Sequence, residues 1–173
     1  MNEWEQREHK MFEYIRDNTE ASDLQMSTDK YSKYDCYNDR MVIELKYRTP
    51  KYGPSNYDST VIERAKYSGL ASTHNVTKKI PIYAVQAEGN IYLFNLLQLA
   101  RDNYDFQWGL QGNFNTTTHF TNTSKKSKEV GYISWDKAIK VIELDEGEIT
   151  KEARETERYS SGSFDYESIS NEL

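Results

Sequence analysis

The stretch "YDCYNDRMVIELKYR" (residues 34–48) decides the fold predicted for this chain. It predicts a hairpin of strands 33–37 and 40–48 joined at Asn38-Asp39, since both residues tolerate the positive φ of a two-residue turn. Side chains alternate between the two faces of a strand, so one face of the second strand is apolar and the other carries Glu44 and Lys46. This turn would pair residue 35 with residue 42. Asp35 would then lie diagonally across from Glu44 on the same face, with Cα atoms roughly 7 Å apart or less.

A helix is predicted upstream, over residues 3–17. At about 100° per residue, its apolar side chains fall on one arc: Trp4, Met11, Phe12 and Ile15. Glu8 lies within the same arc, which is unusual because burying an unpaired carboxylate is costly. Glu8 either points inward or lies at the edge of the arc and reaches water.

Downstream of the hairpin, the pattern predicts further helices and strands. Thr60 and Glu63 have the spacing of a capping box, which predicts a helix over residues 61–68 that ends near Gly69. Strands are expected at 24–28, 80–87 and 91–94, a helix at 96–102, and a last apolar element in "GYISWDKAIKVIEL". Strands in mixed order with helices packed on them make an α/β or α+β domain.

Composition narrows the class of protein. With 173 residues, the chain is long enough for one domain with a substantial core. Its single cysteine, Cys36, excludes an internal disulfide framework and indicates a reducing compartment. No apolar run approaches the roughly 20 residues of a membrane span, and the charged N-terminus lacks the apolar stretch of a signal peptide. We therefore expect an intracellular, cytoplasmic protein without a membrane partner.

The net charge of −6 is unevenly distributed. Residues 141–173 hold ten acidic residues and three basic ones, and the rest of the chain is nearly balanced. This segment is also poor in aliphatic residues, which is typical of a solvated tail. We therefore expect one domain over residues 1–140, followed by a last apolar element and a flexible acidic tail over 141–173. On this basis, deletion of residues 145–173 would leave the fold intact and raise the affinity for nucleic acid.

The ordered set of a helical Glu8, a strand Asp35 and the triplet Glu44-Leu45-Lys46 resembles the PD-(D/E)xK nuclease superfamily. The resemblance covers about residues 3–87, including the helix and strand predicted after the hairpin. One departure is Tyr34, which stands before Asp35 where the family pattern has proline. The resemblance implies a restriction-endonuclease-like fold, in which a mixed central sheet is flanked by helices.

It also implies a function: hydrolysis of phosphodiester bonds by metal-activated water, in DNA rather than RNA. Mg²⁺, or Mn²⁺ in its place, takes hard oxygen ligands and keeps several waters, so one or two carboxylates suffice. The implied ligands are the Asp35 and Glu44 carboxylates and the Leu45 carbonyl, with Glu8 at a water-mediated or second-metal position. Lys46 would orient the attacking water or balance the charge of the transition state.

Further candidates for contacts with nucleic acid are Lys66, Gln86, Lys125 and Lys126. A solvated side chain is the favoured interpretation of Lys66, Gln86 either closes the site or ends a buried strand, and a polar loop explains Lys125 and Lys126 equally well. An alternative function is a catalytically inactive, nuclease-like binding or regulatory module that acts on nucleic acid or a protein partner. A third interpretation is a plain structural domain with a charged outer face. A homodimer or a larger complex is compatible with the resemblance, and the pattern does not distinguish endonuclease from exonuclease action.

Overall fold

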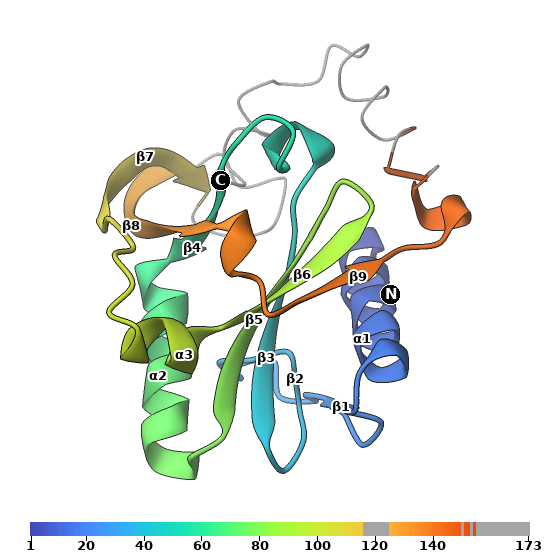
Figure 1. Cartoon of the computed structure of the whole chain (residues 1–173), viewed down its shortest axis with the longest axis horizontal. Coiled ribbons are helices and arrows are strands. Elements are labelled where there is room, and N and C mark those ends of the chain that lie inside the picture. Colours follow the sequence, from blue (N-terminus) through green and yellow to red (C-terminus); the bar gives the residue numbers. More distant parts are fainter. Residues whose placement is uncertain (116–124, 150, 153, 155–173) are drawn as a thin grey trace.

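The computed structural model describes residues 1–115, 125–149, 151, 152 and 154, and for residues 113–115, 125 and 126 it describes the backbone alone. Its centre is a six-stranded sheet (Figure 1). In spatial order the strands are β1 (Gln25–Met26), β2 (Cys36–Tyr37), β3 (Met41–Tyr47), β5 (Ile80–Ala87), β6 (Asn90–Asn95) and β9 (Lys140–Glu143). Only β3 and β5 pair in parallel, so the sheet is mixed.

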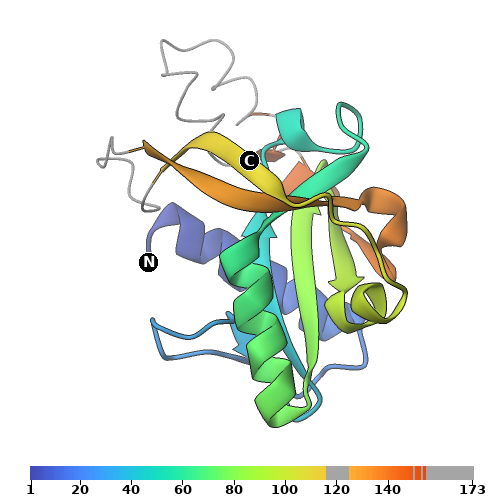
Figure 2. The ribbon, with the colours of Figure 1, turned by 90° about the vertical axis from the view of Figure 1, so that its left-hand side faces the viewer.

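Helices cover both faces of this sheet. Helix α1 (Glu3–Asn18) packs on one face, and α2 (Arg64–Thr77) and α3 (Leu96–Arg101) pack on the other (Figure 2). Two 3₁₀ turns, Pro50–Tyr52 and Trp135–Lys137, lie in the connections. The predicted fold class, a mixed α/β domain with a mixed sheet flanked by helices, is confirmed.

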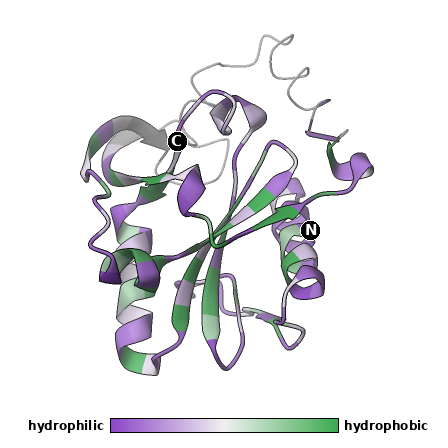
Figure 3. Cartoon of the chain, in the orientation of Figure 1, coloured by the Kyte–Doolittle hydropathy of each residue, from purple (hydrophilic) through white to green (hydrophobic). Residues whose placement is uncertain are grey.

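The alternation along β3 divides the core into two layers. Ile43 and Leu45 pack with Met11 and Ile15 of α1, whereas Val42 packs on the other face with Leu70 of α2. Strand β5 is buried on both faces, as expected for a central strand with parallel pairing, and it occupies the predicted residues 80–87. Hydrophobic residues accordingly lie along the central strands (Figure 3).

A second, three-stranded antiparallel sheet crosses one end of the molecule. Its order is β4 (Ser59–Glu63), β8 (Lys125–Ser134), β7 (Gly109–Asn115). The predicted helix over residues 61–68 is therefore wrong at its start, because residues 59–63 form β4 and α2 begins only at Arg64. Gly69 does not end this helix, which continues to Thr77.

The hairpin turn also differs from the prediction. Asn38 pairs with Met41, so the two turn residues are Asp39 and Arg40. The Asn38 Oδ1 accepts hydrogen bonds from the N–H groups of Arg40 and Met41, both at 2.8 Å, which holds the chain in this turn. As a result, Cys36 pairs with Ile43, two residues away from the predicted register.

The acidic C-terminal segment begins inside the fold. Strand β9 is the sixth strand of the main sheet, and Leu144 is buried. Glu152 is 5% exposed, and its carboxylate accepts hydrogen bonds from the Gly89 N–H and the Gln86 Nε2 at 2.6 and 2.7 Å. Strand β9 and Leu144 lie where a last apolar element was expected, whereas the buried Glu152 belongs to the segment expected as a solvated tail. Residues 155–173 lie outside the described part of the chain.

Within the described residues, no helix has both the length and the apolar composition needed to cross a membrane.

Candidate active site

Asp35 and Glu44 come together at the open end of the β2–β3 hairpin. The register of the two strands ends at the pair of Cys36 and Ile43, and Asp35 and Glu44 are the next residues along the two chains, which differs from the predicted diagonal arrangement. The Asp35 N–H donates to the Ile43 carbonyl at 2.9 Å. Its carboxylate Oδ2 accepts the Leu45 N–H at 2.7 Å, so the side chain replaces a main-chain partner where β2 ends.

Glu44 is a buried carboxylate with one ion pair. It lies on β3 and is 5% exposed. Its Oε1 lies 2.5 Å from the Lys66 Nζ, which comes from the first turn of α2. The other oxygen, Oε2, is buried and has no hydrogen-bond partner among the described residues. A buried carboxylate oxygen without a donor is costly, and such a group is typical of a site that awaits a cation.

The carboxyl groups of Asp35 and Glu44 both have a raised pKa, and the charge of Asp35 contributes to the shift of Glu44. Burial and then the Asp35 carboxylate raise the pKa of Glu44 to about 7, against opposing contributions from Lys66 and Lys46. Burial also raises the pKa of Asp35, which the Leu45 N–H, the Lys66 charge and a side-chain hydrogen bond with Glu44 partly counteract. Two carboxyl groups that share a desolvated position resist ionising together, which favours a bound cation.

Glu8 belongs to the same electrostatic cluster, although it lies on α1 rather than on the hairpin. Its side chain is half-buried, which is compatible with both orientations that the sequence left open. Burial and then the Asp35 carboxylate raise the pKa of Glu8 to about 7, and Lys46 and Lys66 oppose this rise. The structure thus brings Glu8 within electrostatic reach of Asp35 and of the two lysines.

Lys46 and Lys66 supply the positive charge of the cluster. Lys46 is half-buried on the same strand face as Glu44, as the alternation predicted. Lys66 was expected near the site only as a candidate for a phosphate contact, and its ion pair with Glu44 was not predicted. The helix start predicted from the sequence was wrong, so the direction of the Lys66 side chain could not be predicted.

The residues fit a hard divalent cation with few protein ligands. In a strand the N–H and C=O of one residue point to the same side, so the Leu45 carbonyl faces the side on which its N–H meets Asp35. Two carboxylates and this carbonyl satisfy Mg²⁺, which keeps several waters of its own. The described residues contain no group of three or more His, Cys, Asp or Glu side chains placed to hold a metal. Glu8 is therefore not part of a preformed three-carboxylate site.

Two predicted contacts lie elsewhere. Gln86 pairs in register with Tyr47, whose face of the sheet is opposite to that of Glu44, and its amide binds Glu152. The structure does not bring Gln86 to the carboxylates. Lys125 and Lys126 begin β8, but their side chains lie outside the described part of the chain.

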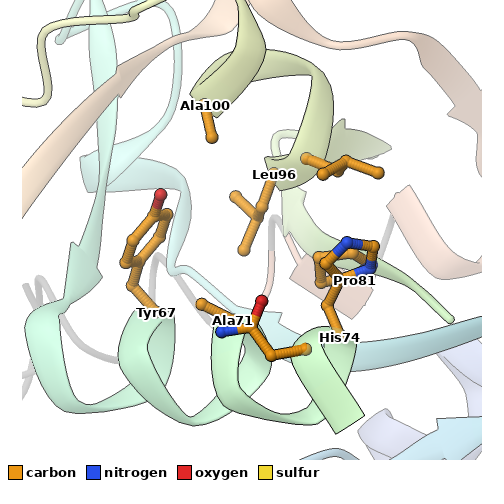
Figure 4. A pocket seen from close by; sticks show the side chains of 8 residues that line it. Tyr67, Ala71, His74, Pro81, Leu96 and Ala100 are labelled. Carbon is orange, nitrogen blue, oxygen red and sulfur yellow. The ribbon is translucent and has the colours of Figure 1, made fainter. Parts of the chain in front are cut away.

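A pocket of about 150 Å³ lies between α2 and α3 (Figure 4). Its surface is mainly apolar, and its lining residues include Tyr67, His74 and Pro81. None of the carboxylates or lysines described above lines it. Its volume is below the roughly 300 Å³ of ordinary ligand pockets, so it is not the candidate active site.

No family model matches the chain, and no curated protein matches it. Among solved structures, the chain is similar to Hjc, a Holliday junction resolvase from Archaeoglobus fulgidus, an archaeal hyperthermophile. The identity is 12%, the alignment covers 79% of this chain and 88% of the resolvase, and the TM-score is 0.43. The similarity is distant, and the assignment of the site rests on the residues of the chain itself.

Proposed function

We propose that the chain is a Mg²⁺-dependent nuclease that hydrolyses phosphodiester bonds, with DNA as its substrate in preference to RNA. The observation that carries the proposal is the pairing of Asp35 and Glu44 at the end of one hairpin. Both are desolvated, both have a raised pKa, and one buried oxygen of Glu44 has no donor among the described residues. Two desolvated carboxyl groups side by side lower the stability of a folded chain. Groups with strongly shifted pKa values are common at functional sites.

When bound, a divalent cation makes a water nucleophilic at neutral pH and stabilises the departing oxyanion. Asp35, Glu44 and the Leu45 carbonyl would hold this cation. The Leu45 N–H fixes the Asp35 carboxylate, so one ligand is already oriented by the main chain. Glu8, half-buried and coupled to Asp35, would act through a water or at a second cation.

Lys46 would act on the substrate rather than on the cation. It follows Glu44 by two residues on the same strand face, so its ammonium lies beside the carboxylates. In that position it would orient the attacking water or stabilise the negative charge that develops on the phosphate. Removal of such a preorganised donor typically slows a reaction by about a hundredfold or more.

Cleavage assays test this proposal. Purified protein would be incubated with supercoiled plasmid, a linear DNA duplex or an RNA of matching sequence, in MgCl₂, MnCl₂ or EDTA. We expect cleavage of DNA only with a divalent cation, and its loss in Asp35→Asn, Glu44→Gln and Lys46→Met. Glu63→Gln serves as the matched control, because it removes another carboxylate that pairs with a lysine, Lys128 at 3.0 Å.

Circular dichroism and thermal unfolding would show that each variant remains folded. If the wild type leaves every nucleic acid intact in both metals, the enzymatic proposal is lost. Loss of cleavage in the Glu63→Gln control alone, with Asp35→Asn still active, would also contradict the assignment.

The Lys66 ion pair favours one alternative, a nuclease-like module that binds nucleic acid or a protein without cleaving. An ammonium at 2.5 Å partly neutralises Glu44 in the absence of any metal, so the site has a counter-charge of its own. Such a module would bind DNA equally well in EDTA and in Mg²⁺, and the Glu44→Gln variant would not change its affinity.

A further inference from the structure

The ion pair between Lys66 and Glu44 joins a mobile partner to a fixed one. Glu44 is 5% exposed in the central sheet, whereas the Lys66 side chain is 48% exposed. A lysine ammonium on its four-carbon stem is a point charge with three rotatable donors, so it can leave a partner without disturbing the helix that carries it. The carboxylate cannot move in the same way, because β3 is paired on both sides.

The ammonium also lies next to the position that a divalent cation would take, since it contacts Oε1 of the carboxylate whose Oε2 has no partner among the described residues. It contacts Oε1 of Glu44 and lowers the pKa of Asp35 and Glu8 as well, so it lies within the field of all three carboxyl groups. Two positive charges a few ångströms apart repel, so a cation on Oε2 of Glu44 would weaken the ion pair between the same carboxylate and the Lys66 ammonium.

We propose that Lys66 is the resident counter-cation of Glu44: a divalent cation displaces it, and the released ammonium then binds a phosphate of the nucleic acid. This inference rests on the proposed function and deepens it, because it makes metal binding the signal that frees a substrate contact. Lys66 thereby links the two binding events, and the linkage is reciprocal: DNA that engages Lys66 also favours metal binding.

The first test measures metal affinity without any substrate. Isothermal titration with MnCl₂ would compare the wild type with Lys66→Met and Lys66→Arg at about pH 8.5, where protons compete least for the carboxylates. We expect the Mn²⁺ dissociation constant to fall roughly tenfold in Lys66→Met, because binding no longer breaks an ion pair. Lys66→Arg keeps a cation on Glu44 and should show no such gain.

Lys151→Met is the matched control for lost charge. Lys151 also pairs with a glutamate, Glu148 at 3.5 Å, but its side chain is 69% exposed and Glu148 lies outside the carboxylate cluster. This variant should bind Mn²⁺ as the wild type does. If Lys151→Met and Lys66→Met gained Mn²⁺ affinity equally, the loss of one positive charge would explain the effect, and the proposal would be overturned.

The second test measures DNA affinity with and without metal. Binding of a labelled duplex would be followed across a salt series in CaCl₂ and in EDTA. We expect Lys66→Met to weaken binding in CaCl₂ and to lower the salt slope by about one, as for the loss of one phosphate contact. In EDTA, where Lys66 remains on Glu44, the variant and the wild type should bind alike.

The outcomes separate this inference from the proposed function. Two results would show that a divalent cation does not displace Lys66, even where the wild type cleaves DNA. One is an unchanged Mn²⁺ dissociation constant in Lys66→Met, and the other is an equal loss of DNA binding in CaCl₂ and in EDTA. If the wild type never cleaves but Lys66→Met changes both the Mn²⁺ affinity and the DNA binding in CaCl₂ as expected, the displacement of Lys66 is supported and the enzymatic proposal fails.

Discussion

Replacing Glu44 with glutamine should stabilise the metal-free protein at neutral and alkaline pH. Glutamine keeps the shape of the side chain but cannot ionise, so it removes a buried charge that the fold tolerates poorly. Lys66 loses its partner in this variant, yet its side chain is 48% exposed and remains solvated. The expected gain in stability would identify Glu44 as a residue that destabilises the metal-free fold.

The size of the effect follows from the pKa of Glu44, which rises from an ordinary value of 4.5 to about 7 in the folded protein. This difference corresponds to about 3 kcal/mol of unfolding free energy. Between these two pH values the folded state holds a proton that the unfolded state has lost, so stability falls as the pH rises and the loss is complete above about pH 7. Glu44→Gln should therefore match the wild type near pH 4 and exceed it by about 2–3 kcal/mol at pH 8.

Urea denaturation in EDTA at several pH values between about 4 and 8 measures this difference. Glu63→Gln is the control, since its carboxylate is partly exposed and paired with Lys128, and it should change stability by less than about 1 kcal/mol at every pH. A Glu44→Gln variant that is less stable than the wild type at pH 8, or a gain independent of pH, would refute the reasoning.

Further predictions concern stability away from the site. Glu152→Ala should lower the unfolding free energy by about 2 kcal/mol in urea, because the Gly89 N–H loses a buried acceptor. Deletion of residues 145–173 removes the same acceptor and should destabilise the fold at least as much, contrary to the expectation from composition. Gly131→Ala should cost about 1–3 kcal/mol in thermal unfolding, since its Cβ would lie 2.8 Å from Cζ3 of Trp108. Unchanged unfolding midpoints in these variants would contradict the packing described.

Elements whose residues carry a complete local pattern were predictable from the sequence. Helix α1 was expected at 3–17 and spans Glu3–Asn18, because its apolar arc is regular and Asn2 and Glu5 cap it reciprocally. Strand β5 occupies the residues expected for it, since a short, almost entirely apolar run suits a central strand.

Residues 59–63 show where local patterns fail. The spacing of Thr60 and Glu63 fits a capping box, but neither side chain makes that contact, because α2 starts without a side-chain cap. The segment instead pairs with residues 130–134, about 70 positions later in the chain. A partner so distant in sequence leaves no periodic signal near residue 60, and tertiary pairing overrides the local preference.

The candidate site was predictable in its residues but not in its geometry. Alternation along β3 placed Glu44 and Lys46 on one face whatever the turn, which is why they were found. The register depended on the side chain of Asn38, which moves the turn by one residue and pairs Cys36 with Ile43, so that Asp35 and Glu44 follow next along the two chains. Lys66 was placed by a helix start that the sequence misassigned, so its contact with Glu44 required the structure.

The central claim is that Asp35 and Glu44 share a divalent cation. A crystal of the protein soaked in MnCl₂, with anomalous scattering collected at the manganese edge, measures this directly. We expect one anomalous peak bound by both carboxylates and the Leu45 carbonyl, with the Lys66 ammonium moved away from Glu44. A soaked crystal with no peak between the two carboxylates and Lys66 still paired to Glu44 would contradict it.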